Sequence, residues 1–222
     1  VYTPKMVSIG PYHKKNPQLG PMEKYKLLYL RRFLQRKEGL DVKSCITYLE
    51  HLKEEALKCY DDIEDLDTDG SHEFCKMLLF DGCFVVEFIR ECCGIHPEVE
   101  NKIININHNY IFRDLMLLEN QLSFFVLDKL HDMAKQDDEL PLETLVNKVF
   151  TFFVNWPKMT LESFGKIECN AKNINHLLHV VHIFSCHGNP MKNLEDCSTS
   201  PAVMPNATEL FEAGVSYAKV RN

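Results

Sequence analysis

The stretch RDLMLLENQLSFFVLDKL, residues 113–130, decides the fold of this chain. On a helix its apolar side chains occur on every side, with Leu115 and Val126 on one face and Leu117 on the opposite face. A helix that is apolar all round is either buried in a protein core or spans a membrane. The stretch also contains acids and amides, which a bilayer disfavours: Asp114, Glu119, Asn120 and Gln121. We therefore expect a mainly α fold, an irregular helical bundle around a buried central helix at about 113–130.

The rest of the chain divides into helical segments and one extended arm. Apolar residues at helical spacing predict helices at 22–37, 42–60, 73–93, 142–156 and 174–187. Residues 1–21 contain four prolines and two glycines, which is typical of an extended arm with turns. An arm without a sheet of its own needs partners for its backbone, so we expect it to lie across helices and fill a groove. Residues 94–112 are predicted to be a connection.

Length and composition indicate one globular helical domain over residues 1–222. We expect the arm at 1–21, a helical core at 22–187, and a mobile loop plus a helix at 188–222 that leads into a missing C-terminal part. The net charge of −7 argues against bulk attraction to nucleic acid. No apolar run reaches the length of a bilayer span, so we expect this chain to be soluble.

Two carboxylates are predicted to be buried. Asp81 falls in the middle of the apolar arc of 73–93, and Glu119 shares the apolar side of the central helix. A buried carboxylate must be paired, hydrogen-bonded or protonated. We expect a structural polar network that fixes how the arm crosses the helices, with these members: Asp81, Glu119, Asn120, Gln121, Tyr12, His13 and Lys26. Glu87 lies outside the arc and is expected to be solvated.

The helix at 22–37 is strongly basic. Its candidate basic surface consists of Lys24, Arg31, Arg32, Arg36 and Lys37. Such a face suits phosphate or anionic lipid. A solvated face, or one paired with an acidic segment further on, accounts for the same residues.

Two patterns resemble metal sites without completing one. Asp65, Asp67 and Asp69 are spaced like the start of a calcium-binding EF-hand loop, but Lys76 occupies the position that needs a bidentate Glu. Histidines with one cysteine occur near the C-terminal end of the helical core, at His176, His179, His182, Cys186 and His187. Steps of three residues drift round a helix, so only neighbouring pairs could share a zinc ion. We predict no metal site and no cofactor.

The nine cysteines include no CxxC pair, and several lie in apolar helical runs. Buried free thiols in a reducing compartment fit this pattern, and disulfides are the alternative.

Several segments together resemble one plant family, known as domain of unknown function 247. They are YTPKMVSIGPYH (2–13), Met22, Glu23 and Lys26 with YLRRFL (29–34), FCKMLLFDGCFVVE (74–87), RDLMLLENQLSFFVL (113–127), HLL (176–178) and ATELFEAGV (207–215). The family usually has a proline where this chain has Ser123, a departure that would ease helix continuation. The resemblance implies a longer parent, anchored in the plasma membrane by a hydrophobic C-terminal segment or cytoplasmic. It implies roles in recognition such as self-incompatibility, and it carries over no catalytic residues.

Two functions remain open. The first is a non-enzymatic interaction or signalling module with unknown protein partners, in which the buried acids and amides are structural. The second is an enzyme that uses Asp81 and Glu119 as general acid and base, assisted by Tyr12 and His13. A pocket that reaches Asp81, Glu119 and His13 would favour the enzyme, and a filled core would favour the module. Binding of a membrane surface through the basic helix is a third hypothesis.

Overall fold

The computed structural model describes residues 3–61, 71–95, 102–154 and 174–187. These residues are mainly helical, as the sequence predicts. The elements are the 3-10 helix η1 (Pro17–Met22) and the α-helices α1 (Glu23–Gln35), α2 (Val42–Leu57), α4 (Ser71–Cys92), α5 (Lys102–Leu115), α6 (Phe124–Ala134), α7 (Leu142–Val154) and α9 (Leu177–His187). The single domain predicted over 1–222 stays a prediction, and the loop and helix predicted at 188–222 lie outside the described residues.

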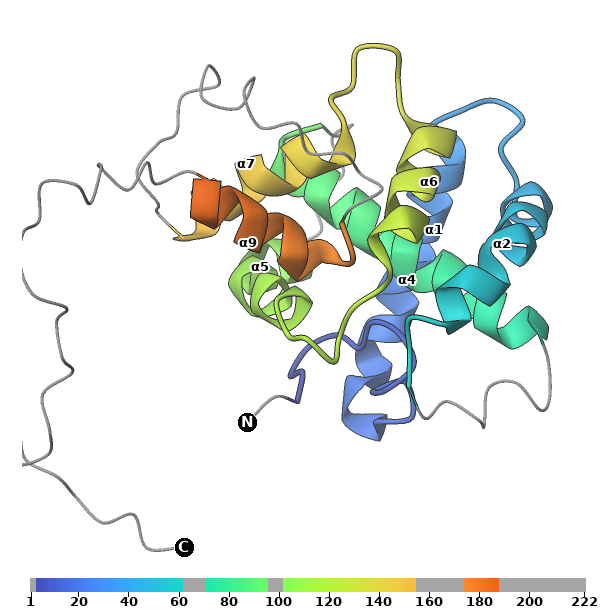
Figure 1. Ribbon diagram of the computed structural model, residues 1–222, viewed down its shortest axis with the longest axis horizontal. Coiled ribbons are helices and arrows are strands. Elements are labelled where there is room, and N and C mark those ends of the chain that lie inside the picture. The colour runs from blue at the N-terminus through green and yellow to red at the C-terminus, as the bar shows by residue number, and fades with distance from the viewer. Residues whose placement is uncertain (1–2, 62–70, 96–101, 155–173, 188–222) are drawn as a thin grey trace, which may run out of the picture. The chain divides into compact units, whose positions relative to one another are not determined.

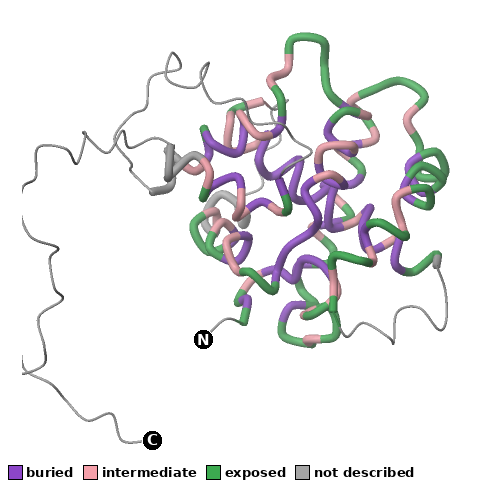
Figure 2. Tube along the Cα trace, viewed as in Figure 1, coloured by how far each residue is buried: buried purple, intermediate pink, exposed green. Residues whose placement is uncertain are grey.

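Helix α4 is the helix around which the others pack. It contacts α1, α2, α6 and α7 (Figure 1). Every residue from Asp81 to Arg90 is buried, so this half of α4 has no solvent-facing side (Figure 2). A helix enclosed in this way is the central helix of the bundle.

The prediction of one continuous central helix at 113–130 is wrong. Helix α5 ends at Leu115 and α6 begins at Phe124, with turns between them. Many apolar side chains of the stretch are indeed buried, but burial on all sides does not require one continuous helix. The amide side chain of Gln121 donates to the carbonyl oxygens of Leu115 and Leu117, and so satisfies backbone groups that a continuing helix would have used.

The region predicted as a connection, 94–112, is mostly α5. The other predicted helices agree with α1, α2, α4, α7 and α9 to within a few residues at each end. The cause of the missed helix is composition, because isoleucine and asparagine have modest helix propensity.

The N-terminal arm, residues 3–16, is extended with turns and forms no strand. Val7 and Ile9 are almost fully buried and belong to the main apolar core. The arm is therefore part of the packed body, as the sequence predicts for a segment that fills a groove.

Candidate functional site

Three buried side chains hold the arm by its backbone, and we call them the arm clasp: Asp81, Asp114 and Asn120. Asp81 lies in the middle of α4, Asp114 lies one residue before the end of α5, and Asn120 lies in the turn between α5 and α6. Each is at most 3% exposed. Together they place one acceptor after another along the extended arm.

Asp114 binds the first part of the arm. Its Oδ2 atom accepts three consecutive backbone N–H groups, those of Lys5 (2.9 Å), Met6 (2.6 Å) and Val7 (3.2 Å). Its Oδ1 atom accepts from the guanidinium of Arg113 at 3.0 Å. Three amides converging on one carboxylate oxygen form a concave anion site, which here is filled by a side chain of the same chain.

Asn120 binds the next part as a neighbouring strand would. Its Oδ1 accepts the N–H of Ile9 at 2.7 Å, and its Nδ2 donates to the carbonyl of Val7 at 3.1 Å. The same Nδ2 donates to the carbonyl of Asp114 at 3.0 Å. One side chain therefore satisfies both polar groups that an extended backbone presents on one edge.

Asp81 ends the clasp and connects it to α1. Its Oδ2 accepts the N–H of Gly10 at 2.9 Å, and its Oδ1 accepts from Nζ of Lys26 at 2.7 Å. Lys26 is 2% exposed and also lies 2.7 Å from the carboxylate of Glu23. Burial alone would lower the pKa of Lys26, but the nearby carboxylates outweigh burial and raise it.

Glu119 is not buried, contrary to the expectation from the sequence. Its side chain is 64% exposed, and its Oε2 lies 3.8 Å from Nε2 of His13. The expectation assumed a continuous helix, whereas Glu119 lies in the turn that replaces it. Asp81 and Glu119 therefore do not form a pair of buried acids.

Three other expected members of the network, Gln121, Tyr12 and His13, do not bind the backbone of the arm as the arm clasp does. Gln121 is 8% exposed, but its amide caps the end of α5 and does not bind the arm. Tyr12 is 46% exposed, and its hydroxyl donates to the carbonyl of Asp61. His13 lies on the surface side of the network, with its Nε2 near the exposed carboxylate of Glu119. Asp114 was not expected to bind the arm, although it lies within the stretch 113–130 that is predicted to be buried.

A second buried group of charges was missed entirely, and we call it the charge cluster: Arg36, Glu87, Arg90, His131 and Glu139. Glu87 and Arg90 are fully buried and paired at 2.8 Å, so the expectation that Glu87 is solvated is wrong. Arg36 donates two hydrogen bonds to the Glu87 carboxylate, and Arg90 donates two to that of Glu139. Nε2 of His131 lies 3.0 Å from the Glu139 carboxylate. The cluster connects α1, α4, α6 and the loop before α7.

This geometry determines the pKa of Glu139. Burial would raise it, but hydrogen bonds from His131 and Arg90 and the charge of Arg90 outweigh burial and lower the pKa to about 2.

The basic surface is smaller than the sequence suggests. Arg32 is paired with Glu91 at 2.9 Å and Arg36 belongs to the charge cluster, so both are largely covered. Lys24, Arg31 and Lys37 are exposed on or just beyond α1.

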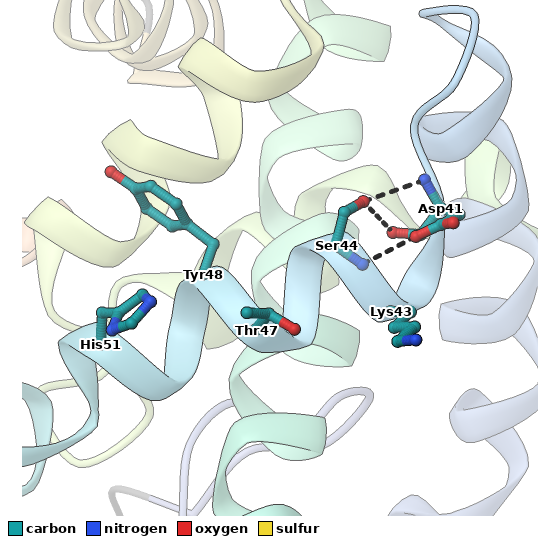
Figure 3. A pocket seen from close by; sticks show the side chains of 6 residues that line it. All are labelled: Asp41, Lys43, Ser44, Thr47, Tyr48 and His51. Carbon is teal, nitrogen blue, oxygen red and sulfur yellow. Dashed lines mark hydrogen bonds between the residues drawn. The ribbon is translucent and has the colours of Figure 1, made fainter.

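Two of the surface hollows among the described residues bear on the candidate site. The larger, about 420 Å³, is a shallow depression along α2, where Thr47, Tyr48 and His51 project from one helix (Figure 3). The smaller, about 200 Å³, opens above the Lys26–Asp81 pair and is bordered by Lys14, Glu23 and Lys76. Neither is lined by Glu119 or His13.

The described residues contain no group of three or more His, Cys, Asp or Glu side chains placed to hold a metal ion. The EF-hand-like loop lies mostly outside the described residues. In the part of the chain that the structure describes, six cysteines are free thiols: Cys45, Cys59, Cys75, Cys83, Cys92 and Cys93. Burial raises the pKa of the Cys45 and Cys93 thiols to about 11. None of the helices in the described ranges combines the length and apolar character needed to cross a bilayer.

The fold and the arm clasp define a mainly helical protein in which an extended segment is held by buried acids and an amide. A family model described as a plant protein of unknown function, DUF247, matches residues 1–222, so the chain belongs to this family. Two relatives come from Arabidopsis thaliana. A putative UPF0481 protein, At3g02645, is 30% identical over 62% of this chain and 25% of its own length. The UPF0481 protein At3g47200 is 33% identical over 69% of this chain and 32% of its own length. No solved structure matches the chain.

Proposed function

We propose that this chain is a non-enzymatic interaction module of a plant protein that works in recognition or signalling, such as self-incompatibility or stress and development signalling. The protein would be associated with the plasma membrane or would be cytoplasmic. The observation that carries the proposal is the use of Asp81. Both of its carboxylate oxygens accept hydrogen bonds from the same chain, one from the Gly10 N–H and one from Lys26. We therefore assign Asp81 a structural role and not a catalytic one.

The arrangement of the polar side chains supports a module over an enzyme. Acid–base catalysis at the predicted pair needs Asp81, Glu119 and His13 around one cavity. The hollow above Asp81 is lined by neither of the other two, and two of its three lysines, Lys26 and Lys76, are each paired with an acid. A stable body with an enclosed polar interior instead presents fixed outer helix faces, which suits binding of a protein partner.

The experiment replaces both members of the buried pair in the double variant Asp81→Asn/Lys26→Met. Replacing both partners of a buried pair by neutral groups of similar size is often tolerated, so we expect this variant to fold, as checked by circular dichroism. Wild type and variant are then used to capture proteins from plant tissue. A module should capture the same saturable partner with both chains, because the pair lies beneath the surface.

The second readout is chemical. Both chains are incubated with a small-molecule extract of the same tissue, and the mixture is profiled before and after. A compound depleted by the wild type and left intact by the folded double variant would overturn the proposal in favour of an enzyme.

A further inference from the structure

The outward face of α1 carries an alternation of cations and leucines, and we call it the α1 ridge: Lys24, Leu27, Arg31 and Leu34. Positions three, four and three residues apart lie on one side of a helix. The opposite side of α1 is its buried side, with Lys26, Tyr29, Leu30 and Phe33. The ridge therefore faces away from α4, the helix against which α1 packs.

Leu27 is the apolar centre of the ridge. It is 53% exposed, whereas Leu34, at the far end of the ridge, is half-buried and packs against the core. A single exposed leucine is ordinary on a protein surface. What sets Leu27 apart is its position between two cations, with Lys24 one turn before it and Arg31 one turn after it.

Lys24 and Arg31 differ from the neighbouring cations of the chain in their ion pairs. Lys26, Arg32 and Arg36 of the same helix form ion pairs with acids of α1 or α4. Lys24 and Arg31 belong to none of the ion pairs found in the described part of the chain, although Lys24 lies 5.1 Å from the centre of the Tyr25 ring. Both are exposed, in a chain whose net charge is −7.

Within residues 22–40, the described segment that contains the ridge, the acids are Glu23 and Glu38. Glu23 lies at its edge, but its carboxylate is bound to Lys26. Glu38 is exposed and lies beyond the end of α1. The ridge therefore presents a positive, partly apolar strip on an acidic protein.

We propose that the α1 ridge is a docking surface for an acidic amphipathic helix of a partner protein. Such a helix packs its own apolar side chains beside Leu27, and its carboxylates meet Lys24 and Arg31. An anionic membrane offers the same charge but suits the ridge less well. Only one leucine of the ridge is more than half exposed, which is little apolar surface for burial in a bilayer. This inference rests on the proposed function and names the chemistry of the partner.

The first test uses a designed probe, a fluorescent helical peptide of about 15 residues. Its leucines and glutamates are spaced to match the ridge, and a scrambled peptide serves as its control. Binding to the full chain is measured by fluorescence anisotropy. We expect the double variant Lys24→Glu/Arg31→Glu to weaken binding by about tenfold or more. The matched control Lys43→Glu/Lys58→Glu changes the same charge on α2 and should change affinity by less than about twofold. A second peptide carries lysine in place of each glutamate, and we expect it to restore part of the lost affinity of the Lys24→Glu/Arg31→Glu variant.

The second test places a photo-crosslinking residue at position 27, and separately at position 48 on α2, in the chain exposed to plant extract. The sequence of the peptide joined at position 27 is read by mass spectrometry. An acid-rich helical segment supports the proposal, and a basic or neutral segment overturns it.

Vesicles decide between protein and lipid. Flotation with anionic but not neutral vesicles, abolished by the ridge reversal, together with no peptide binding, would overturn the proposal in favour of a membrane surface. Peptide affinity equal in the ridge variant and the α2 control would also overturn it. If capture of a saturable partner survives the ridge reversal, this inference fails while the proposed function stands.

Discussion

Asp81 and Glu119 are two carboxylates whose predicted burial can be compared with their burial in the structure. The same helical-wheel argument predicts both to be buried, yet Asp81 is 3% exposed and the side chain of Glu119 is 64% exposed. Asp81→Ala should reduce the free energy of unfolding by about 3–5 kcal/mol, because it leaves the Gly10 N–H without its acceptor and the buried Lys26 with only the exposed carboxylate of Glu23 as a partner. Glu119→Ala should change it by no more than about 0.5 kcal/mol, since an exposed charge contributes little. Urea denaturation measures both, and equal losses would contradict the assignment.

Gly10 supplies the second prediction at this scale. Its φ of +77° is unfavourable for other residues, and a Cβ there would lie 2.6 Å from the carbonyl oxygen of Gln121. Gly39 has nearly the same φ, +81°, but a Cβ there would meet nothing within 4 Å. Gly39→Ala should therefore cost about 1 kcal/mol from backbone conformation alone.

Gly10→Ala should cost at least about 2 kcal/mol more than this control, because a backbone oxygen cannot move aside without shifting the turn before α6. Thermal unfolding of the two variants compares them directly. A cost for Gly10→Ala no larger than that of Gly39→Ala would mean that the arm can lift away from the turn freely.

At the scale of elements, sequence patterns locate most helices but do not identify which of them is central. Helical spacing of apolar residues locates α1, α2, α4, α7 and α9, because one face of each packs on the core. The stretch 113–130 is apolar on all sides, and such a stretch carries no periodicity that distinguishes a helix from a buried turn. The family's usual proline at position 123 was a better guide. Ser123 is the N-cap of α6, and proline is readily accommodated at the start of a helix.

The arm clasp was predictable in part, and the charge cluster was not. Asp81 is conspicuous because it interrupts an apolar arc. Glu87 and Arg90 lie outside that arc, and they are buried only because the end of α1 and the loop carrying Glu139 cover them. A hydrophobic pattern locates apolar faces, so ion pairs buried between elements distant in sequence leave no trace in it.

The loop before α7 gives a prediction about pH. The folded-state pKa of Glu139 is about 2, below the ordinary value of 4.5. A lowered carboxyl pKa adds stability at neutral pH that is lost as the pH falls from about 5 to about 2. The difference in unfolding free energy between wild type and Glu139→Gln should therefore shrink by about 3 kcal/mol over this range.

Denaturant titrations at pH 7, 5, 4, 3 and 2 measure this difference. Asp138→Asn, an exposed acid of the same loop, is the control and should change stability by less than about 0.5 kcal/mol at pH 7. A wild-type advantage over Glu139→Gln that stays constant with pH would show that the charge cluster does not stabilise the Glu139 carboxylate.

The arm itself gives a prediction that separates the members of its clasp. Asp114→Ala removes the acceptor of the Met6 and Val7 amides, and Asn120→Ala removes the acceptor of the Ile9 amide. Native-state hydrogen exchange should therefore be faster at the Met6 and Val7 amides in Asp114→Ala, and faster at the Ile9 amide in Asn120→Ala. Identical exchange patterns in the two variants would mean that the arm opens as one unit and that no acceptor acts locally.

At the scale of the whole molecule, the arm behaves as a bound extended peptide that happens to be covalently attached. Its amides are satisfied by side chains of α4, α5 and the following turn, and its Val7 and Ile9 side chains complete the core. A segment bound in this way should be separable from the body and able to rebind. A chain starting at Pro11 removes the backbone donors that the arm supplies to the clasp and uncovers part of the core, so its free energy of unfolding should fall by about 4 kcal/mol or more.

A synthetic peptide of residues 1–12 should then restore stability by mass action, by about 2.7 kcal/mol when its concentration is one hundred times its dissociation constant. The control peptide carries Ile9→Asp, which places a charge in the apolar core and should restore nothing. If the shortened chain unfolds during purification, refolding is carried out with each peptide present, and recovery of folded protein is compared. A shortened chain as stable as the full one, or rescue by both peptides alike, would show that the helices hold together without the arm and that the clasp serves some other end.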